Sequence, residues 1–261
     1  MKYANMLSLS PQKTVSLERL AYFISLTISV LSAVYLVIVS ITGYSWLPFL
    51  SIDNNASDLT LSLIQCVLGA TALHIPMAAQ KLFRLKIPNA LSICFYAFVL
   101  CGTVLGEMFS LYYAVPIWDS LLHLGSGIMA GILGSLLVVQ WLQKKGYDGL
   151  LSPVFVAVVA ICFALCIGVA WEIYEFAGDT LLGLNMQKCL LQDGTELIGK
   201  AAIADTMKDL IVDTAGAVIA ALCSAISLKK KSGWLCSCRT IELANPKTQL
   251  DLEKEVLPYT A

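Results

Sequence analysis

Long apolar stretches alternate with short polar segments along most of the chain. A helix needs about 20 consecutive apolar residues to cross the hydrocarbon core of a bilayer. Hydropathy and length therefore predict six membrane-spanning helices, and the expected fold class is an all-α, polytopic transmembrane helix bundle. The predicted spans are roughly residues 20–42, 59–80, 89–111, 118–141, 152–180 and 206–228.

Prolines and the first apolar run refine these predictions. Pro88, Pro116 and Pro153 stand at or near the starts of predicted helices, where a missing N–H group costs little. Pro76 lies inside the second span, so we expect that span to be kinked or shortened. The apolar run at 20–41 is longer than the core of a signal peptide and no small-residue cleavage site follows it, so we expect a retained span.

Composition agrees with a membrane protein. Of the 261 residues, 58% are hydrophobic and only 13% are charged, whereas a soluble domain carries about 25% charged residues. Nothing in this composition suggests nucleic-acid binding. Six cysteines fall in apolar runs, where they act as small hydrophobes, and Cys236 and Cys238 are expected to be reduced cytosolic thiols. With Cys189 alone in an outer loop, we expect no structural disulfide.

The basic residues predict the orientation of the bundle. Fourteen of the seventeen lysines and arginines lie before the first span, after the last, or in the loops after the second and fourth spans. The positive-inside rule then places both termini in the cytosol. The expected organisation is a cytosolic segment at 1–19, a transmembrane domain at 20–228 and a cytosolic tail at 229–261. Lys188, Lys200 and Lys208 are the basic residues on the outer side.

Carboxylates recur at helical spacing in two of the predicted spans. Asp205, Asp209 and Asp213 stand every fourth residue in the stretch DTMKDLIVDTAGA, so they share one stripe of the last helix over about 12 Å of depth. The fifth span ends in WEIYEFAGD, whose acids are also three and four residues apart. With the predicted orientation, both stripes lie in the outer half of the membrane.

Two more predicted helices place ionisable residues in the outer half of the membrane. Asp119 and His123 are one turn apart at the outer end of the fourth span, and Glu107 is close to the outer end of the third. Below His123, the GxxxG pair Gly127 and Gly131 allows close approach of another helix. We therefore expect the acidic stripes to face one another inside the bundle rather than lipid.

Charged carboxylates at this depth need compensation, because each costs at least about 2.5–3.5 kcal/mol in a bilayer. Either several are protonated or cations hold them together. Carboxylates with a single imidazole suit Mg²⁺, Mn²⁺, Ca²⁺ or Zn²⁺, so we expect a divalent metal ion and no organic cofactor. The predicted metal ligands are Asp119, His123, Glu172, Glu175, Asp209 and Asp213. Glu107, Asp179 and Asp205 are further candidates. For Asp119, Asp179 and Asp205, which stand near predicted helix ends, an interfacial capping role is the alternative.

Three motifs in order, WDSLLHLGSG, WEIYEFAGD and DTMKDLIVDTAGA, resemble those of the YjdF-type bacterial membrane proteins, a family without an assigned reaction. The resemblance covers about residues 90–228. It implies a bacterial cytoplasmic membrane protein whose signature positions are Asp119, His123, Glu172, Glu175, Asp209 and Asp213. A looser likeness to VanZ-type membrane proteins is an analogy only.

Three functions follow from the predicted site. The first is a metal-binding membrane protein, with a metal-dependent enzyme on a lipid-linked or envelope substrate as its specific form and with His123 as ligand or general base oriented by Asp119. The second is a proton- or cation-coupled transporter, because intramembrane acids often mark ion pathways. The third is a structural or regulatory protein whose helices are held together by metal. The lipid bilayer is the one partner expected in all three cases.

Overall fold

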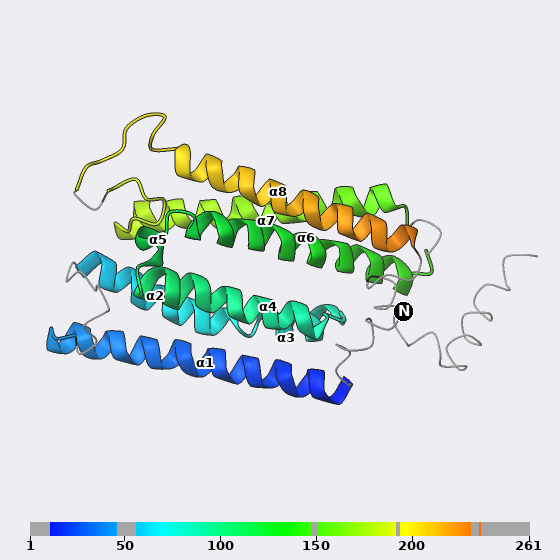
Figure 1. Ribbon diagram of the computed structural model, residues 1–261, viewed down its shortest axis with the longest axis horizontal. Coiled ribbons are helices and arrows are strands. Elements are labelled where there is room, and N and C mark those ends of the chain that lie inside the picture. The colour runs from blue at the N-terminus through cyan, green and yellow to red at the C-terminus, as the bar shows by residue number, and fades with distance from the viewer. Residues whose placement is uncertain (1–10, 46–55, 148–150, 192–193, 231–234, 236–261) are drawn as a thin grey trace, which may run out of the picture.

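The computed structural model describes residues 11–45, 56–147, 151–191, 194–230 and 235 (Figure 1). These residues are mostly helical and contain no β-strand, only an isolated antiparallel bridge between Leu190 and Glu196. The elements in chain order are α1 (Pro11–Thr42), α2 (Ala56–Ala72), α3 (Ile75–Phe83), α4 (Asn89–Leu100), the π-helix η1 (Cys101–Met108), α5 (Leu111–Ala114), α6 (Trp118–Lys144), α7 (Pro153–Leu182) and α8 (Ala204–Lys229).

Six helical segments of the described residues are long and apolar enough to cross a membrane, which confirms the predicted all-α bundle of six spans. Large apolar side chains such as Leu31, Ile173 and Leu222 are exposed on the outside of the bundle. This exposure is expected where the solvent is lipid. The spans are Val15–Thr42, Leu59–Phe83, Asn89–Met108, Trp118–Lys144, Pro153–Leu182 and Ala204–Lys229.

The helices form two groups, which lie one above the other in Figure 1. Helices α6, α7 and α8 pack against one another pairwise, and α1, α2, α4 and η1 make the second group. The two groups meet mainly where α6 contacts α4 and η1. Because α6 and α8 enter from the same end at which α7 finishes, the three motifs of the sequence come to one end of the first group.

Small residues allow α6, α7 and α8 to approach closely. Ala130, Ala164 and Ala217 form a buried cluster with one residue from each helix. Further along, the Ser135 hydroxyl donates to the Ser224 hydroxyl at 2.8 Å, which satisfies two buried polar groups between α6 and α8. In a membrane such packing and interhelical hydrogen bonds supply the association that hydrophobic burial supplies in water.

Two of the spans are irregular. The second is broken between α2 and α3, with Pro76 in the first turn of α3, as the proline predicted. The third changes from α- to π-helix at Cys101 and ends at Met108, short of the expected end at 111. The Tyr112 ring packs on the backbone of Gly106, where an added Cβ would lie 2.4 Å from a ring carbon. Glu107, the next residue of the π-turn, lies within electrostatic range of Tyr112.

Candidate metal centre

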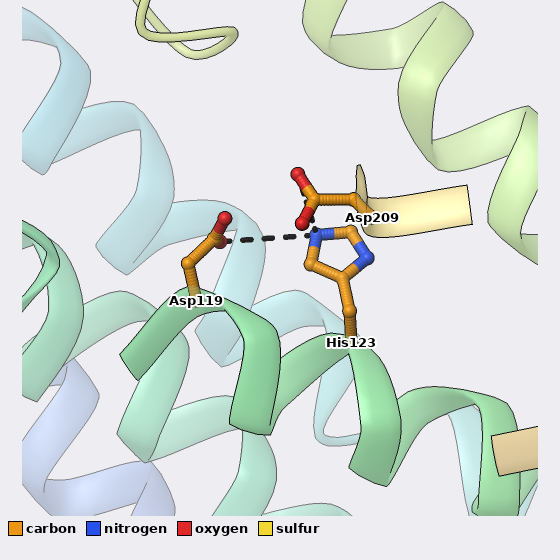
Figure 2. A group of neighbouring side chains, drawn as sticks. All are labelled: Asp119, His123 and Asp209. Atoms are coloured by element: carbon orange, nitrogen blue, oxygen red, sulfur yellow. Dashed lines mark ion pairs between the residues drawn. The ribbon is translucent and has the colours of Figure 1, made fainter. Parts of the chain in front are cut away.

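His123 and two carboxylates from two helices form the centre of the site (Figure 2). Asp119 and His123 are one turn apart on α6, and Asp209 reaches them from α8. His123 Nε2 lies 3.8 Å from Asp119 Oδ1 and 3.8 Å from Asp209 Oδ2. One ligand atom from each of the three residues can be chosen so that all lie within 4.8 Å of one another. His123 and Asp209 are buried, and Asp119 is partly exposed.

The fourth residue of this centre, Asp213, orients the histidine ring. His123 Nδ1 lies 3.2 Å from Asp213 Oδ2, and the Ser126 hydroxyl donates to Asp213 Oδ1 at 2.6 Å. With its proton on Nδ1, the neutral ring donates to Asp213 and turns the lone pair of Nε2 toward Asp119 and Asp209. Metal-binding histidines are commonly held by a carboxylate in this way.

Glycines bring the three helices close enough for these contacts. A Cβ on Gly127 of α6 would lie 2.3 Å from the carbonyl oxygen of Asp213, and one on Gly216 of α8 would lie 2.5 Å from that of Leu124. On α7, a Cβ on Gly168 would lie 2.7 Å from Asp213 Oδ2. The Asp213 carboxylate therefore occupies space that any other residue at 168 would fill. The close approach expected from the GxxxG pair occurs in the structure.

Lys208 supplies a positive charge at the edge of the cluster. Its ammonium lies 3.8 Å from Asp119 Oδ2, 3.6 Å from Asp205 Oδ1 and 3.7 Å from Asp209 Oδ1. Asp205 and Asp209 therefore both have Lys208 as an ion-pair partner, and for Asp205 this lysine stands one helical turn away. The Lys208 side chain is 45% exposed, so the cluster is open on this side.

Buried carboxylate oxygens without a hydrogen bond lie next to the cluster. Both oxygens of Glu172 on α7 are buried and make no hydrogen bond of ordinary geometry. Asp209 Oδ1 is also buried without a hydrogen bond, and its contact is the 3.7 Å ion pair with Lys208. Glu172 lies within electrostatic range of His123, and the Thr206 hydroxyl on α8 is close enough to interact with its carboxylate. An unpaired buried carboxylate is costly. These oxygens are therefore the atoms of the site that most need a cation or a proton.

The remaining predicted candidates lie farther from His123 or have structural partners. Glu175 accepts a hydrogen bond from the Trp171 indole at 2.8 Å, one turn away on α7. Asp179 accepts the backbone N–H groups of Met186 and Gln187 at 2.6 and 3.0 Å, so it anchors the loop that follows α7. The contact is made to the loop after α7 and not to the first turn of a helix, so it differs from both the metal-ligand and the capping expectation for Asp179. Glu107 lies on η1, within electrostatic range of Lys188.

Ser126, Tyr112 and Lys188 also lie at this end of the bundle, although the sequence motifs did not select them as site residues. Ser126 follows His123 by three residues, a spacing that places both on one face of α6, and this was the available signal. Lys188 lies on the anchored loop with its ammonium 4.5 Å from the centroid of the Tyr112 ring. Burial alone would lower the pKa of Lys188, but the charges of Glu107 and other nearby groups raise it above its usual value, so the side chain stays cationic. No sequence pattern pairs a loop lysine with a tyrosine 76 positions earlier.

Hydrogen bonds hold the Lys188 segment in place. The Gln187 amide donates to the Thr206 hydroxyl at 2.9 Å, which ties the loop to the first turn of α8. The Cys189 thiol lies 3.4 Å from the carbonyl oxygen of Ala202. Burial raises the pKa of this thiol, and the charges of Asp179 and Asp205 add to the effect. The loop is thus connected at several points to the helices that carry the site.

Comparison with known families agrees with this architecture. The family described as "Predicted membrane protein (DUF2238)" matches residues 24–230. The chain belongs to this family. It is the family of the YjdF-type proteins that the three motifs indicated. The match to DUF2238 includes most of the first span and all of the other five, whereas the motif resemblance reached only from about 90 to 228. No curated protein and no solved structure matches the chain.

Proposed function

We propose that this DUF2238 protein binds one divalent metal ion through Asp119, His123 and Asp209, with Glu172 as a further ligand from α7. The observation that carries the proposal is the orientation of His123. Its Nδ1 atom is engaged by Asp213, and its Nε2 atom faces two carboxylates from different helices. A histidine held in this way presents a lone pair where two anionic oxygens already converge.

The distances suit a small ion after a modest contraction. A tetrahedral site with bonds of about 2.1 Å keeps its ligand atoms about 3.4 Å apart. The two Nε2–carboxylate separations are 3.8 Å and all three ligand atoms lie within 4.8 Å of one another, so the His123 contacts need to close by a few tenths of an ångström and the two carboxylates by at most about 1.4 Å. One imidazole with several carboxylates suits Zn²⁺ or Mn²⁺, and Mg²⁺ and Ca²⁺ remain candidates because most donors are oxygens.

A metal at this position supplies a Lewis acid that can polarise a phosphoryl or carbonyl oxygen. In the orientation expected from the positive-inside rule, both termini are cytosolic and the site lies in the outer half of the membrane. The partly exposed Lys208 lies nearer the start of α8 than Ala217 of the small-residue core. A lipid-linked or envelope substrate is therefore the class that could reach the site. In this arrangement His123 acts as a ligand, because its Nε2 atom faces the ion and its Nδ1 atom is engaged by Asp213.

Two other functions are distinguished by the same experiments. A proton-coupled transporter would use protonation of the buried acids, but the face below Asp213 continues with Gly216, Ala217 and Ala220, all buried and none able to carry a proton. A metal-stapled structural protein would share the site without turning over any substrate. The measured metal content distinguishes the proton-coupled transporter from our proposal. Enzymatic activity distinguishes the structural protein from a metal-dependent enzyme.

The test is elemental analysis with thermal unfolding of detergent-purified protein, with and without chelator. We compare the wild type with Asp209→Asn and Glu172→Gln. The matched control is Glu196→Gln, which removes an exposed carboxylate from the loop before α8. We expect stoichiometric metal in the wild type and the control, loss of metal in Asp209→Asn, and weaker binding in Glu172→Gln. A wild-type protein that contains no metal and whose melting temperature does not change when chelator is added would refute the proposal and favour protonated acids.

If metal is present, hydrolysis of phospholipid and lipid-phosphate substrates in mixed micelles is measured next. Turnover that is lost with the metal in Asp209→Asn supports an enzyme. Metal-dependent stability without turnover of any of these substrates supports the structural role.

A further inference from the structure

Asp119 and Asp209 each divide their two oxygens between the His123 imidazole and the Lys208 ammonium. Asp119 directs Oδ1 at His123 Nε2 and Oδ2 at the Lys208 ammonium. Asp209 directs Oδ2 at His123 Nε2 and Oδ1 at the same ammonium. The two carboxylates therefore link the imidazole side of the cluster to the lysine side. Carboxylates shared in this way are typical of centres that hold two cations about 3.5–4 Å apart.

The lysine side has the ligands of a cation position of its own. Asp205 Oδ1 joins Asp119 Oδ2 and Asp209 Oδ1 around the ammonium, at 3.6–3.8 Å. These separations exceed the usual length of a charged hydrogen bond, which is about 2.7–2.9 Å. Asp209, which is 1% exposed, also has no hydrogen bond at Oδ1. The long ion pair to Lys208, at 3.7 Å, is thus the polar contact that this buried oxygen makes, and the ammonium fills the space in front of it only loosely.

We propose that Asp119, Asp205 and Asp209 form a second cation position, and that Lys208 occupies it in place of a second divalent ion. This inference rests on the proposed function, because it takes the first position, at His123, to be a metal site. The protein then binds one exogenous ion where two bridging carboxylates could hold two. The ligand class of the second position, once Lys208 is removed, is a hard divalent cation, since all three donors are carboxylate oxygens.

The charge of Lys208 also affects the first position. An ammonium that shares two carboxylates with a metal ion repels that ion and competes for its ligands. Removing the ammonium frees Asp119 Oδ2, Asp205 Oδ1 and Asp209 Oδ1 together. Two effects are therefore expected from one substitution: a second ion binds, and the first binds about tenfold more tightly or better.

The test is a titration of the full-length protein in detergent with Mn²⁺, read by elemental analysis and by electron paramagnetic resonance. We expect one Mn²⁺ per wild-type chain, with the spectrum of an isolated ion. Lys208→Met should bind two, with the exchange-coupled spectrum of neighbouring ions. Lys208→Arg keeps the positive charge and should bind one. Lys200→Met, which removes an exposed lysine from the loop before α8, is the matched control and should bind one.

The outcomes separate this inference from the proposed function. A wild-type protein that binds no ion refutes the proposed function. One ion in both the wild type and Lys208→Met refutes the second position while leaving the first intact. If Lys208→Met does not fold, Lys208→Gln is purified with Mn²⁺ and must show the same rise to two ions. If that variant also fails, the wild-type spectrum decides, because exchange coupling at saturating Mn²⁺ would show that Lys208 does not exclude a second ion.

Discussion

The crossing of α6 and α8 couples helix packing to the geometry of the site, and Gly127→Ala tests this coupling. The methyl group added by this substitution would lie 2.3 Å from the Asp213 carbonyl oxygen and 3.0 Å from its carbonyl carbon. Both atoms belong to the backbone of α8, so no side-chain rotation relieves the clash. Ordinary contact begins at 3.4 Å, and the helices must therefore separate locally by about 1 Å.

A separation of this size affects both stability and metal binding. Overpacking of a tight interface costs about 1–3 kcal/mol. The same shift moves Asp213 and Asp209 away from His123, whose contacts with them are now 3.2 and 3.8 Å. A shift of about 1 Å would leave the imidazole without its orienting hydrogen bond. We therefore expect Gly127→Ala to lower the melting temperature and to weaken metal binding by about tenfold or more.

Gly125→Ala is the matched control, because it lies two residues away on the same helix and an added Cβ there has no atom within 4 Å. Alanine is favoured over glycine within a helix by about 1 kcal/mol, so this variant should be neutral or slightly more stable. The assay is thermal unfolding in detergent together with Mn²⁺ titration of both variants. If Gly127→Ala has the same melting temperature and Mn²⁺ affinity as Gly125→Ala, the proposed dependence of the site on the close approach of α6 and α8 is refuted.

Two other predictions address the second contact of the histidine and the membrane orientation. Asp213→Asn removes the charge beside His123 Nδ1 but keeps a hydrogen-bond acceptor there. Metal affinity should therefore fall about 10–100-fold in a Mn²⁺ titration while the fold is retained. An unchanged affinity would argue against Nε2 as the ligand atom. A membrane-impermeant maleimide should label Cys189 in intact cells but not Cys236 or Cys238, which are predicted to be cytosolic. Because the pKa of Cys189 is raised, its thiolate fraction is small at neutral pH, and labelling should accelerate as the pH rises from 7 toward 9. Labelling of the tail cysteines alone would reverse the orientation.

Most of the fold could be predicted from local properties of the chain. A span is defined by length and hydropathy, which is why the six predicted segments agree with the helices to within a few residues at most ends. The break at Pro76 also follows from one residue, since proline lacks the N–H group that a helix interior requires. The π-helix could not be predicted in this way. It forms where the Tyr112 ring packs onto Gly106, a contact made after the chain has turned at Ser110.

The candidate site was predictable only in part. Helical spacing placed Asp119 with His123 and Asp209 with Asp213, because residues four apart share a helix face. Asp179 shows the limit of that reasoning, since its carboxylate holds the N–H groups of the following loop rather than a group in the cluster. Spacing shows which face a side chain occupies but not which atom it meets there.

The sequence by itself determined the membrane spans, the breaks at prolines and the level at which the acidic residues lie along each helix, because these depend on one segment at a time. Only the tertiary structure decided that His123 turns Nδ1 to Asp213, that both oxygens of Glu172 are buried next to the cluster, and that Lys208 shares the carboxylates of Asp119 and Asp209 with the histidine. These relations depend on the rotation and distance of one helix relative to another. At Gly127 and Gly216 that distance is set by backbone atoms in contact, and the positions of the polar groups follow from it.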